Sequence, residues 1–336
     1  MKPAVSLMVP VFNRAELLVP CLDSALAQTE PDLEVVVVDG ASTDGTWEVC
    51  LRYAAADPRV RIFRDSVNTG PVRGWWRCIE EARATYGTFL WSDDILKPTF
   101  LAETLPVLSD NDVAFVFTAA EIGSEPGAGA IHYAHPSRLM LSREFIEGSL
   151  DGTGNYPVSP ASALFRMCDL RQSFTMELPT RPTRDLTATG AGVDLLLFLL
   201  TALRYPRVAC LSEALAFFRA HAGSMTIDGR GGQITLDYAA TKSWFARQNG
   251  FRDPSPAILA RQWLHEMRAS RRFLSPNSAA RQYGHTVRTV DLVTAAGAHL
   301  LRKAARTLKA RRHPRSEAEA EDAQDGIGTD QGPRIR

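Results

Sequence analysis

The first third of the chain alternates short apolar runs, rich in β-branched residues, with amphipathic stretches of helical length. This alternation is typical of repeated βαβ units, and runs without polar interruption fit strands buried on both faces of a parallel sheet. The predicted strands span residues 5–9, 34–38, 60–63, 88–91 and 113–117, and the predicted helices span residues 14–28, 45–56, 72–85 and 98–108. Asn13, three residues before Glu16, is predicted to cap the first helix.

The pattern changes after residue 117. Residues 118–190 are richer in Gly, Pro and Ser, which predicts a loop-rich insertion of the kind that shapes a substrate site. A helix is expected over residues 193–204 and a strand over residues 208–211, and the chain beyond residue 233 is predicted to be mostly helical up to Arg312. Residues 314–336 carry almost no large apolar side chains, which predicts a disordered acidic tail. We therefore expect three parts, residues 1–230, 231–313 and 314–336.

The composition is that of an ordinary globular protein. Apolar residues make up 45% of the chain and charged residues 23%, which excludes collagen-like and wholly disordered proteins. The 38 Lys and Arg balance the 38 Asp and Glu, so nothing in the total charge indicates a nucleic-acid partner. Five cysteines without C-x-x-C spacing indicate neither a disulfide framework nor a zinc site. Because the N-terminus lacks a signal-peptide pattern and no apolar run is long enough to span a bilayer, we expect a cytoplasmic protein.

The zero net charge hides an uneven distribution. Residues 260–315 contain 13 Lys or Arg and only 2 Asp or Glu, whereas residues 316–336 contain 2 and 6. Within residues 288–309, Arg302, Arg306 and Lys309 fall on one helix face. The opposite, apolar face comprises Val290, Val293, Gly297, Leu300, Leu301, Ala304 and Leu308. Two interpretations stay open: an amphipathic helix at the cytoplasmic face of an anionic membrane, or a helix packed on the first domain with a solvated basic face.

Carboxylates follow two of the predicted strands. In an open parallel sheet, ligands bind beyond the carboxyl ends of the strands. One strand leads into Asp39 and Asp44, and another into Asp93 and Asp94. Two adjacent carboxylates suit Mg²⁺ or Mn²⁺ bound to a diphosphate, although Asp94 could instead cap a helix or shape a turn. For Asp44 the favoured interpretation is a helix cap. Neither G-x-G-x-x-G after the first strand nor a P-loop occurs, which argues against dehydrogenases and P-loop NTPases.

Four motifs in order resemble glycosyltransferase family 2, whose fold is of the GT-A type. They are Val-Pro-Val-Phe-Asn-Arg at 9–14, Val-Val-Val-Val-Asp-Gly-Ala-Ser-Thr-Asp-Gly-Thr at 35–46, Asn-Thr-Gly at 68–70 and Gly-Thr-Phe-Leu-Trp-Ser-Asp-Asp at 87–94. The resemblance covers roughly residues 4–226. It implies a Rossmann-like, mostly parallel α/β domain, followed here by the helical region. It also implies an inverting enzyme that transfers a sugar from a nucleotide-diphosphate donor to an acceptor hydroxyl, with Mg²⁺ or Mn²⁺ holding the diphosphate.

The resemblance also assigns roles by position. It implies that Asp39 contacts the nucleobase and that Asp93 and Asp94 bind the metal and the donor. Residues 217–224 are similar to a Tyr-Arg-x-His-x-x-Ser stretch of relatives, so His221 is a further candidate metal ligand, with a structural histidine as the alternative. The full set of candidate donor-binding residues is Pro10, Phe12, Asn13, Asp39, Arg73, Arg77, Ser92, Asp93, Arg219 and His221. For Arg73 and Arg77 the alternative is an exposed, solvated side chain.

The reaction needs a general base, because an acceptor hydroxyl is a poor nucleophile until its proton is removed. Asp194 follows Gly190 and Gly192 at the start of a predicted helix, where relatives carry an acidic base, and is the candidate catalytic residue. The alternative is a carboxylate that only stabilises the helix N-terminus. The expected acceptor is a saccharide or a lipid-linked molecule in cell-surface polysaccharide or glycolipid synthesis.

Two departures from the family pattern leave the donor base open. Gly40 stands where many relatives carry a second acidic residue, and Trp91 stands where the metal motif often begins. Two other functions were weighed. A sugar-nucleotide nucleotidyltransferase normally has a Gly-rich basic loop after the first strand, which residues 10–14 lack. A catalytically inactive, carbohydrate-binding relative is disfavoured by the retained carboxylates.

Overall fold

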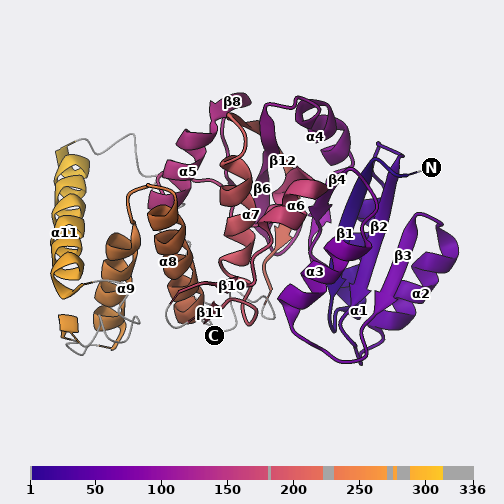
Figure 1. The fold of residues 1–336 in the computed structure, drawn as a ribbon, viewed down its shortest axis with the longest axis horizontal. Helices are drawn as coiled ribbons and strands as arrows, with labels where there is room; N and C mark the ends of the chain where they lie inside the picture. Colours follow the sequence, from indigo (N-terminus) through magenta and orange to yellow (C-terminus); the bar gives the residue numbers. More distant parts are fainter. Residues whose placement is uncertain (1, 181–182, 222–230, 271–274, 278–287, 313–336) are drawn as a thin grey trace. The chain divides into compact units, whose positions relative to one another are not determined.

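The computed structural model describes residues 2–180, 183–221, 231–270, 275–277 and 288–312. The chain divides into two compact units, with the boundary between His221 and Ala222. The first unit is built of strands and helices, and the described part of the second is helical (Figure 1). The acidic tail expected at residues 314–336 lies outside the described residues.

The first unit begins with the predicted alternation of strands and helices. Its elements are β1 (Val5–Val11), α1 (Ala15–Leu26), β2 (Leu33–Asp39), α2 (Thr46–Ala56), β3 (Val60–Arg64), α3 (Pro71–Glu81) and β4 (Tyr86–Phe89). β1 pairs in parallel with β2 and β4, and β2 pairs in parallel with β3. The carboxyl ends of these strands therefore share one edge of the sheet. β4 begins two residues before the predicted strand at 88–91, so Leu90 and Trp91 follow the strand.

The remainder of the unit holds more regular structure than predicted. Its elements are β5 (Ile95–Leu96), α4 (Phe100–Leu108), β6 (Val113–Gly123), β7 (Ala130–His132), β8 (Arg138–Leu141), α5 (Ser142–Asp151), the 3₁₀ turn η1 (Pro160–Ser162), β9 (Ala163–Arg166), α6 (Met167–Ser173), β10 (Glu177–Leu178), β11 (Arg184–Asp185), α7 (Val193–Ala202) and β12 (Arg207–Arg219). The prediction of a loop-rich insertion over residues 118–190 is thus wrong for much of its length. The strands within residues 124–190, β7 to β11, have four residues or fewer, too short to show a hydrophobic period.

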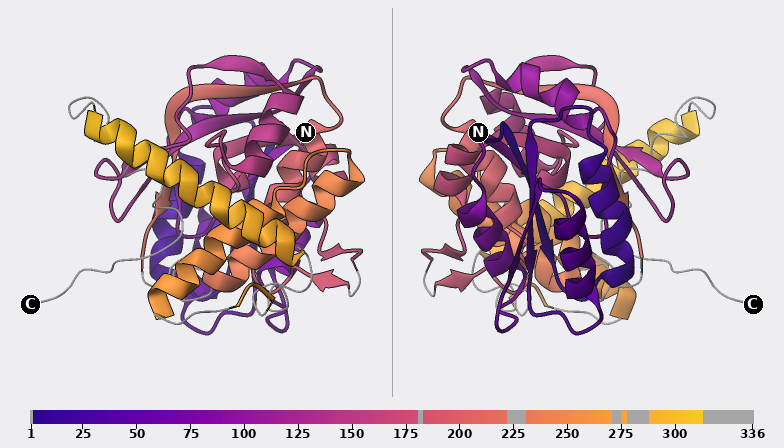
Figure 2. Two further views of the ribbon diagram at one scale, coloured as in Figure 1. Left: turned by 90° about the vertical axis from the view of Figure 1, so that its left-hand side faces the viewer. Right: turned by 90° about the vertical axis from the view of Figure 1, so that its right-hand side faces the viewer.

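The central sheet is mixed and mostly parallel. Its strand order is β3-β2-β1-β4-β9-β6-β12-β5, with β7 beside β6 and β8 beside β12. Four of the seven neighbouring pairs along this path are parallel, and the antiparallel pairs involve β9 and β5. Helices lie on both sides of the sheet (Figure 2). The predicted α/β class with flanking helices and a helical C-terminal region is confirmed.

An aromatic cluster holds α7 against the sheet. Phe198 of α7 lies with its ring centroid 5.1 Å from that of Phe115 on β6 and 5.2 Å from that of Phe165 on β9. Phe145 of α5 packs edge-on against Phe115 at 5.1 Å. All four side chains are completely buried. Aromatic burial of this size fixes the position of α7, and therefore the position of the loop that precedes it.

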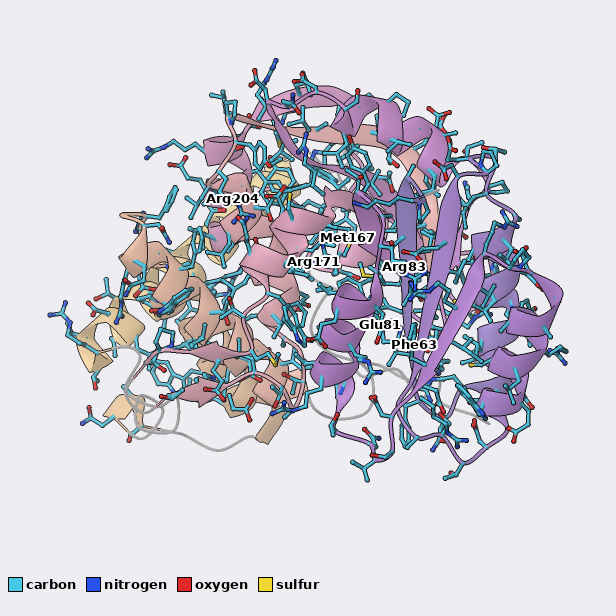
Figure 3. All side chains as sticks on the ribbon, turned by 45° about the vertical axis from the view of Figure 1, so that its right-hand side comes forward. Phe63, Glu81, Arg83, Met167, Arg171 and Arg204 are labelled. Carbon is cyan, nitrogen blue, oxygen red and sulfur yellow. The ribbon has the colours of Figure 1, made fainter. Side chains whose placement is uncertain are left out.

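Helix α6 packs against α3, α7 and β9. Arg171 donates hydrogen bonds to the carbonyl oxygens of Ile79 and Ala82, at the end of α3 (Figure 3). Met167 packs over Gly87 of β4 so closely that a Cβ on Gly87 would lie 2.4 Å from the Met167 sulfur. A side chain at Gly87 would therefore require the Met167 side chain to move.

The second unit contains α8 (Gly231–Gln248), α9 (Ser255–Ser270) and α11 (Thr289–Arg312). α9 packs against both of the other helices. The small core of this unit is formed by Ala239, Leu259, Ala260, Trp263, Leu292 and Ala296. Among the described residues, no helix combines the length and the apolar character needed to cross a membrane.

A buried carboxylate stabilises the amino-terminal edge of the sheet. Glu34 on β2 accepts hydrogen bonds from Ser6 Oγ at 2.6 Å, Arg83 N at 2.6 Å and Arg61 Nη1 at 2.8 Å. Arg61 also donates to the carbonyl oxygen of Glu81. Burial alone would raise the pKa of Glu34, but these hydrogen bonds and the charge of Arg61 outweigh it and lower the pKa.

We expect Glu34→Gln to lower the free energy of unfolding at pH 7 by about 2 kcal/mol, because hydrogen bonds to the charged carboxylate are lost. A lowered pKa in the folded state means that this stabilisation is present above the unfolded value of 4.5 and is lost as the pH falls through the folded value. Urea unfolding between pH 7 and pH 3 measures it, with the exposed Glu177→Gln as control. A difference from wild type that stays constant down to pH 3 would contradict this role.

Candidate functional site

The loops after β1 and β2 are joined by reciprocal hydrogen bonds. Asn13 N donates to Ser42 Oγ, and Thr43 N donates to Asn13 Oδ1, both at 2.9 Å. Asn13 adopts a φ of 50°, a left-handed conformation that asparagine tolerates. Its side chain is thus committed to the neighbouring loop, and the prediction that Asn13 caps the first helix is wrong.

Asp44 caps the start of both helices at this edge. Its Oδ1 accepts from Thr46 N at 3.1 Å at the start of α2, and its Oδ2 accepts from Ala15 N at 3.2 Å at the start of α1. The N-cap residues are Gly45 for α2 and Arg14 for α1, so Asp44 is not itself the N-cap residue, but its carboxylate supplies a capping hydrogen bond to each helix. One carboxylate satisfies backbone donors of both helices, so α1 and α2 begin at fixed positions relative to each other.

Asp39, at the end of β2, is completely buried. Ser42 N donates to its carboxylate at 3.2 Å, and Arg64 Nε lies 3.2 Å from Oδ2. Arg64 Nη2 also donates to the carbonyl oxygen of Ser42 at 2.8 Å. These contacts bind the end of β3 to the loop after β2. The nucleobase contact of Asp39 stays a prediction.

A cavity of about 440 Å³ opens where β3 leads into α3. Its lining residues are Arg64, Asp65, Ser66, Val67, Thr69, Arg73, Arg77 and Glu80. Arg77 is paired with Asp65 at 3.5 Å and with Glu81 at 3.1 Å, and its guanidinium lies 5.8 Å from the centroid of the Phe63 ring. Three arginines against two carboxylates give this cavity a net positive lining, suited to an anionic ligand.

Only Arg73 and Arg77 of this cavity were among the predicted residues. Thr69 belongs to the Asn-Thr-Gly motif at 68–70, whereas Arg64, Asp65, Ser66 and Val67, which directly follow the third predicted strand, were not predicted. The rule that ligands bind beyond the carboxyl ends of parallel strands applies equally to β3, so the signal was present in the sequence.

The two adjacent aspartates after β4 are used differently. Asp93 Oδ2 lies 2.9 Å from His221 Nε2, and its side chain is partly exposed. Asp94 is buried, and its Oδ1 accepts a hydrogen bond from Arg219 N at 2.9 Å. Burial and the nearby charge of Asp93 raise the pKa of Asp94 well above its usual value, against the hydrogen bond and charge of Arg219.

Arg219 connects this loop with the hairpin between β6 and β7. Its Nε donates to the carbonyl oxygen of Asp93 at 3.3 Å, and its Nη1 donates to that of Ser124 at 3.1 Å. Glu125 lies 3.8 Å from the same Nη1. The guanidinium is therefore engaged in positioning the Asp93–Asp94 loop. The prediction that Arg219 reaches the donor diphosphate stays untested.

The donor set around Asp93 fits a divalent cation in part. Among the described residues, no three His, Cys, Asp or Glu side chains converge to form a metal site. Asp93 and His221 do converge, and their oxygen and nitrogen donors suit Mn²⁺ or Mg²⁺. The mutual repulsion of Asp93 and Asp94 would also be relieved by a cation. The metal role of Asp94 stays a prediction, because its Oδ1 is held by Arg219 N.

Asp194 lies in the first turn of α7. Its Oδ1 accepts from Gly192 N at 2.9 Å and from Leu195 N at 2.7 Å, which orients the carboxylate at the helix start. The nearby charge of Asp194 adds to the burial of Tyr133 in raising the pKa of that phenol to about 12. The helix-terminal contacts agree with the alternative interpretation, and they leave the catalytic role of Asp194 as a prediction.

Two indoles lie between the Asp194 loop and the Asp93 loop. Trp75 and Trp91 have ring centroids 4.8 Å apart, and Trp91 Nε1 donates to Ser159 Oγ at 2.8 Å. Gly190 packs directly on Trp75, where a Cβ would lie 2.2 Å from the ring. Trp75 is buried. The loop before Asp194 and the loop after Trp91 thus border the same aromatic cluster.

The remaining predicted residues lie at the same edge. Pro10 pairs with Val38 near the end of β1, and Ser92 is buried beside Asp93. Phe12 is an exposed aromatic side chain close to Gly40. A Cβ added to Gly40 would lie 3.7 Å from the Cβ of Phe12. These contacts leave their donor-binding roles as predictions.

Comparisons with known proteins identify relatives of the first unit. The sequence profile described as Glycosyl transferase family 2 matches residues 6–173, half of the chain. A Bacillus subtilis protein named for teichuronic acid biosynthesis, the glycosyltransferase TuaG, is 27% identical over 188 residues, 56% of this chain and 71% of its own length.

Two solved structures share the fold at low sequence identity. The S. aureus TarS 1–349 structure in complex with UDP-GlcNAc has a TM-score of 0.57 and 16% identity, and the match covers 89% of this chain and 92% of that chain. The mannosyltransferase PcManGT of Pyrobaculum calidifontis, in complex with GDP-Man and Mn²⁺, has a TM-score of 0.50 and 18% identity. The match covers 97% of this chain and 80% of that chain.

We expect Gly190→Ala to destabilise the protein more than Gly152→Ala. Both glycines have a left-handed φ, 73° and 76°, but a Cβ at Gly190 meets the Trp75 ring and a Cβ at Gly152 meets nothing within 4 Å. The conformation alone should cost about 1 kcal/mol in each variant, and the collision a further 1–3 kcal/mol or so at Gly190. Urea unfolding compares the two, and equal losses would mean that the loop before Asp194 does not depend on Trp75.

Proposed function

The chain belongs to glycosyl transferase family 2 and is a glycosyltransferase, and we propose that it transfers a sugar from a nucleotide-diphosphate donor to an acceptor hydroxyl with inversion. We further propose that Mg²⁺ or Mn²⁺ assists the transfer and that the product is a surface polysaccharide or glycolipid. Membership of this family argues against the nucleotidyltransferase alternative, since the family profile spans the first four strands and the Asp93–Asp94 loop.

The observation that supports this proposal most strongly is the meeting of Asp93 and His221. The two residues are 128 positions apart in the sequence, yet Oδ2 and Nε2 lie 2.9 Å apart at the carboxyl edge of the sheet. A carboxylate and an imidazole brought together beside a second carboxylate form a donor set for a divalent ion. When bound, that ion would offset the negative charge of the diphosphate leaving group.

The nucleotide of the donor is proposed to bind near Asp39 and the cavity after β3. Asp39 is joined to the cavity through Arg64, whose guanidinium lies beside its carboxylate. Arg73 and Arg77 would add positive charge close to the phosphates. The two structural neighbours were solved with UDP-GlcNAc and with GDP-Man, so uracil and guanine donors both remain to be compared.

Asp194 is proposed as the general base. As the acceptor oxygen bonds to the anomeric carbon, the bond from that carbon to the diphosphate oxygen breaks, and the hydroxyl proton passes to the Asp194 carboxylate. The backbone donors at Gly192 and Leu195 would hold the carboxylate in one orientation during the transfer. Trp75 and Gly190 would keep the preceding loop against the donor side of the site.

The acceptor and the location are also part of the proposal. The name of TuaG refers to teichuronic acid biosynthesis, which supports a saccharide or lipid-linked acceptor in polysaccharide synthesis. A cytoplasmic protein that attaches to an anionic membrane surface agrees with the 13 Lys and Arg in residues 260–315.

The function is tested with a panel of UDP- and GDP-sugars, each with Mg²⁺ or Mn²⁺, by measuring release of the nucleoside diphosphate with and without saccharide acceptors. We expect release with one donor class, and a product whose anomeric configuration is opposite to that of the donor by NMR. A retained configuration would overturn the inverting mechanism, and no release from any donor would support the inactive alternative.

We expect Asp194→Asn to lower kcat for transfer by about 10²–10⁴-fold, because an amide cannot accept the hydroxyl proton. Donor binding should stay unchanged, since Asp194 is not proposed to contact the nucleotide. The matched control is Asp151→Asn, which alters an exposed aspartate at the end of α5. Full transfer activity in Asp194→Asn would mean that another group is the base.

We expect Asp93→Asn and His221→Ala each to weaken Mn²⁺ binding at least tenfold. Changes next to a metal ligand already cost about 10–100-fold in affinity, and here a ligand itself is lost. Titration of the protein with Mn²⁺, followed by the EPR signal of the free ion, measures this directly, again with Asp151→Asn as control. Unchanged affinity in both variants would remove the metal role from this pair.

A further inference from the structure

Helix α11 carries two apolar faces, and only one of them is packed. Leu292 and Ala296 are buried in the core of the second unit, where α11 packs on α9. Val290, Val293, Leu300 and Leu301 form a separate line of side chains, here called the outer stripe. They are 61%, 46%, 43% and 74% exposed, respectively.

The spacing of these residues explains why the two faces are distinct. At 100° per residue, the outer stripe lies roughly a third of a turn away from Leu292 and Ala296. The helix can therefore pack on α9 and still present the outer stripe outward. Within the second unit, the packing of α11 uses Leu292 and Ala296 and not the outer stripe.

The charge around the outer stripe indicates what would cover it. Residues 260–315 have 13 Lys or Arg and 2 Asp or Glu, so the segment that carries the outer stripe is strongly basic. A second copy of the chain would bring an equally basic segment against this one, and like charges repel. An anionic surface with an apolar layer beneath it matches both the charge and the stripe.

We propose that α11 binds an anionic lipid membrane, lying parallel to its surface with Val290, Val293, Leu300 and Leu301 inserted at the level of the acyl chains. Basic residues of the same segment contact the lipid phosphates. The outer stripe belongs to the second unit and the proposed donor site to the first, so this proposal does not depend on the proposed transfer reaction. It would bring the enzyme to a lipid-linked acceptor.

The test uses the full chain and sedimentation with vesicles, either of pure phosphatidylcholine or with about a third of phosphatidylglycerol. We expect wild type to bind the anionic vesicles, to bind the neutral vesicles much less, and to be released by high salt. Leu301→Asp should weaken partitioning to the anionic vesicles about tenfold or more, because it puts a charge where a leucine inserts. Val293→Asp should act in the same direction.

The matched control is Leu51→Asp, which introduces the same charge at a leucine of α2 that is 48% exposed. Leu51→Asp should bind vesicles like wild type. Both variants should keep the wild-type rate of diphosphate release in the absence of vesicles, which separates a failure of membrane binding from a failure of catalysis. Leu301→Ser is the milder variant if Leu301→Asp does not fold by circular dichroism.

Three results would overturn the proposal. The first is wild-type protein that does not bind anionic vesicles, or binds neutral ones equally well. The second is undiminished binding by folded Leu301→Asp and Val293→Asp, or by Leu301→Ser if the aspartate variants do not fold. The third is a dimer, seen by light scattering without lipid, that Leu301→Asp converts to a monomer, since the outer stripe would then be covered by a second copy of the chain.

Discussion

The carboxylate of Asp39 is completely buried, and a buried charge must be paired. Its partners are Ser42 N in the following loop and Arg64 at the end of β3, and Arg64 in turn donates to the carbonyl oxygen of Ser42. Ser42 Oγ then accepts from Asn13 N after β1. One carboxylate thus fixes the loops after three parallel strands relative to each other, and the arginine-lined cavity lies beside this connection.

The other side of the site depends on apolar packing. Phe198 fixes α7 against β6 and β9, and Gly190 rests on Trp75, which packs at a tilt against Trp91 just before the Asp93 loop. Arg219 then holds that loop from the end of β12. Polar pairing therefore builds the nucleotide side, whereas aromatic packing positions the loops that carry the proposed base and metal ligands.

The two units combine different physical roles. The first unit uses its buried apolar surface to hold strand ends in register, so its polar side chains gather at one edge. The second unit has a smaller core, and α11 uses only one of its two apolar faces in it. An apolar stripe exposed on a basic helix is costly in water and favourable at an anionic interface. This difference agrees with a first unit that carries the proposed catalytic site and a second unit that is proposed to bind the membrane.

The hydrophobic pattern by itself determined the first four strands and the α/β class, because short apolar runs that alternate with amphipathic helical stretches are typical of strands buried on both faces of a parallel sheet. It could not determine β9 and α6, since they lie in a stretch without that alternation, where β9 is placed by its pairing with β4 and β6. Nor could it tell that Asn13 binds Thr43, that Asp94 is held by Arg219, or that Asp93 meets His221. Those contacts join residues from 30 to 128 positions apart. Only the tertiary structure decides them, because the side chain that satisfies a polar group is chosen by the strands and helices that bring it within reach.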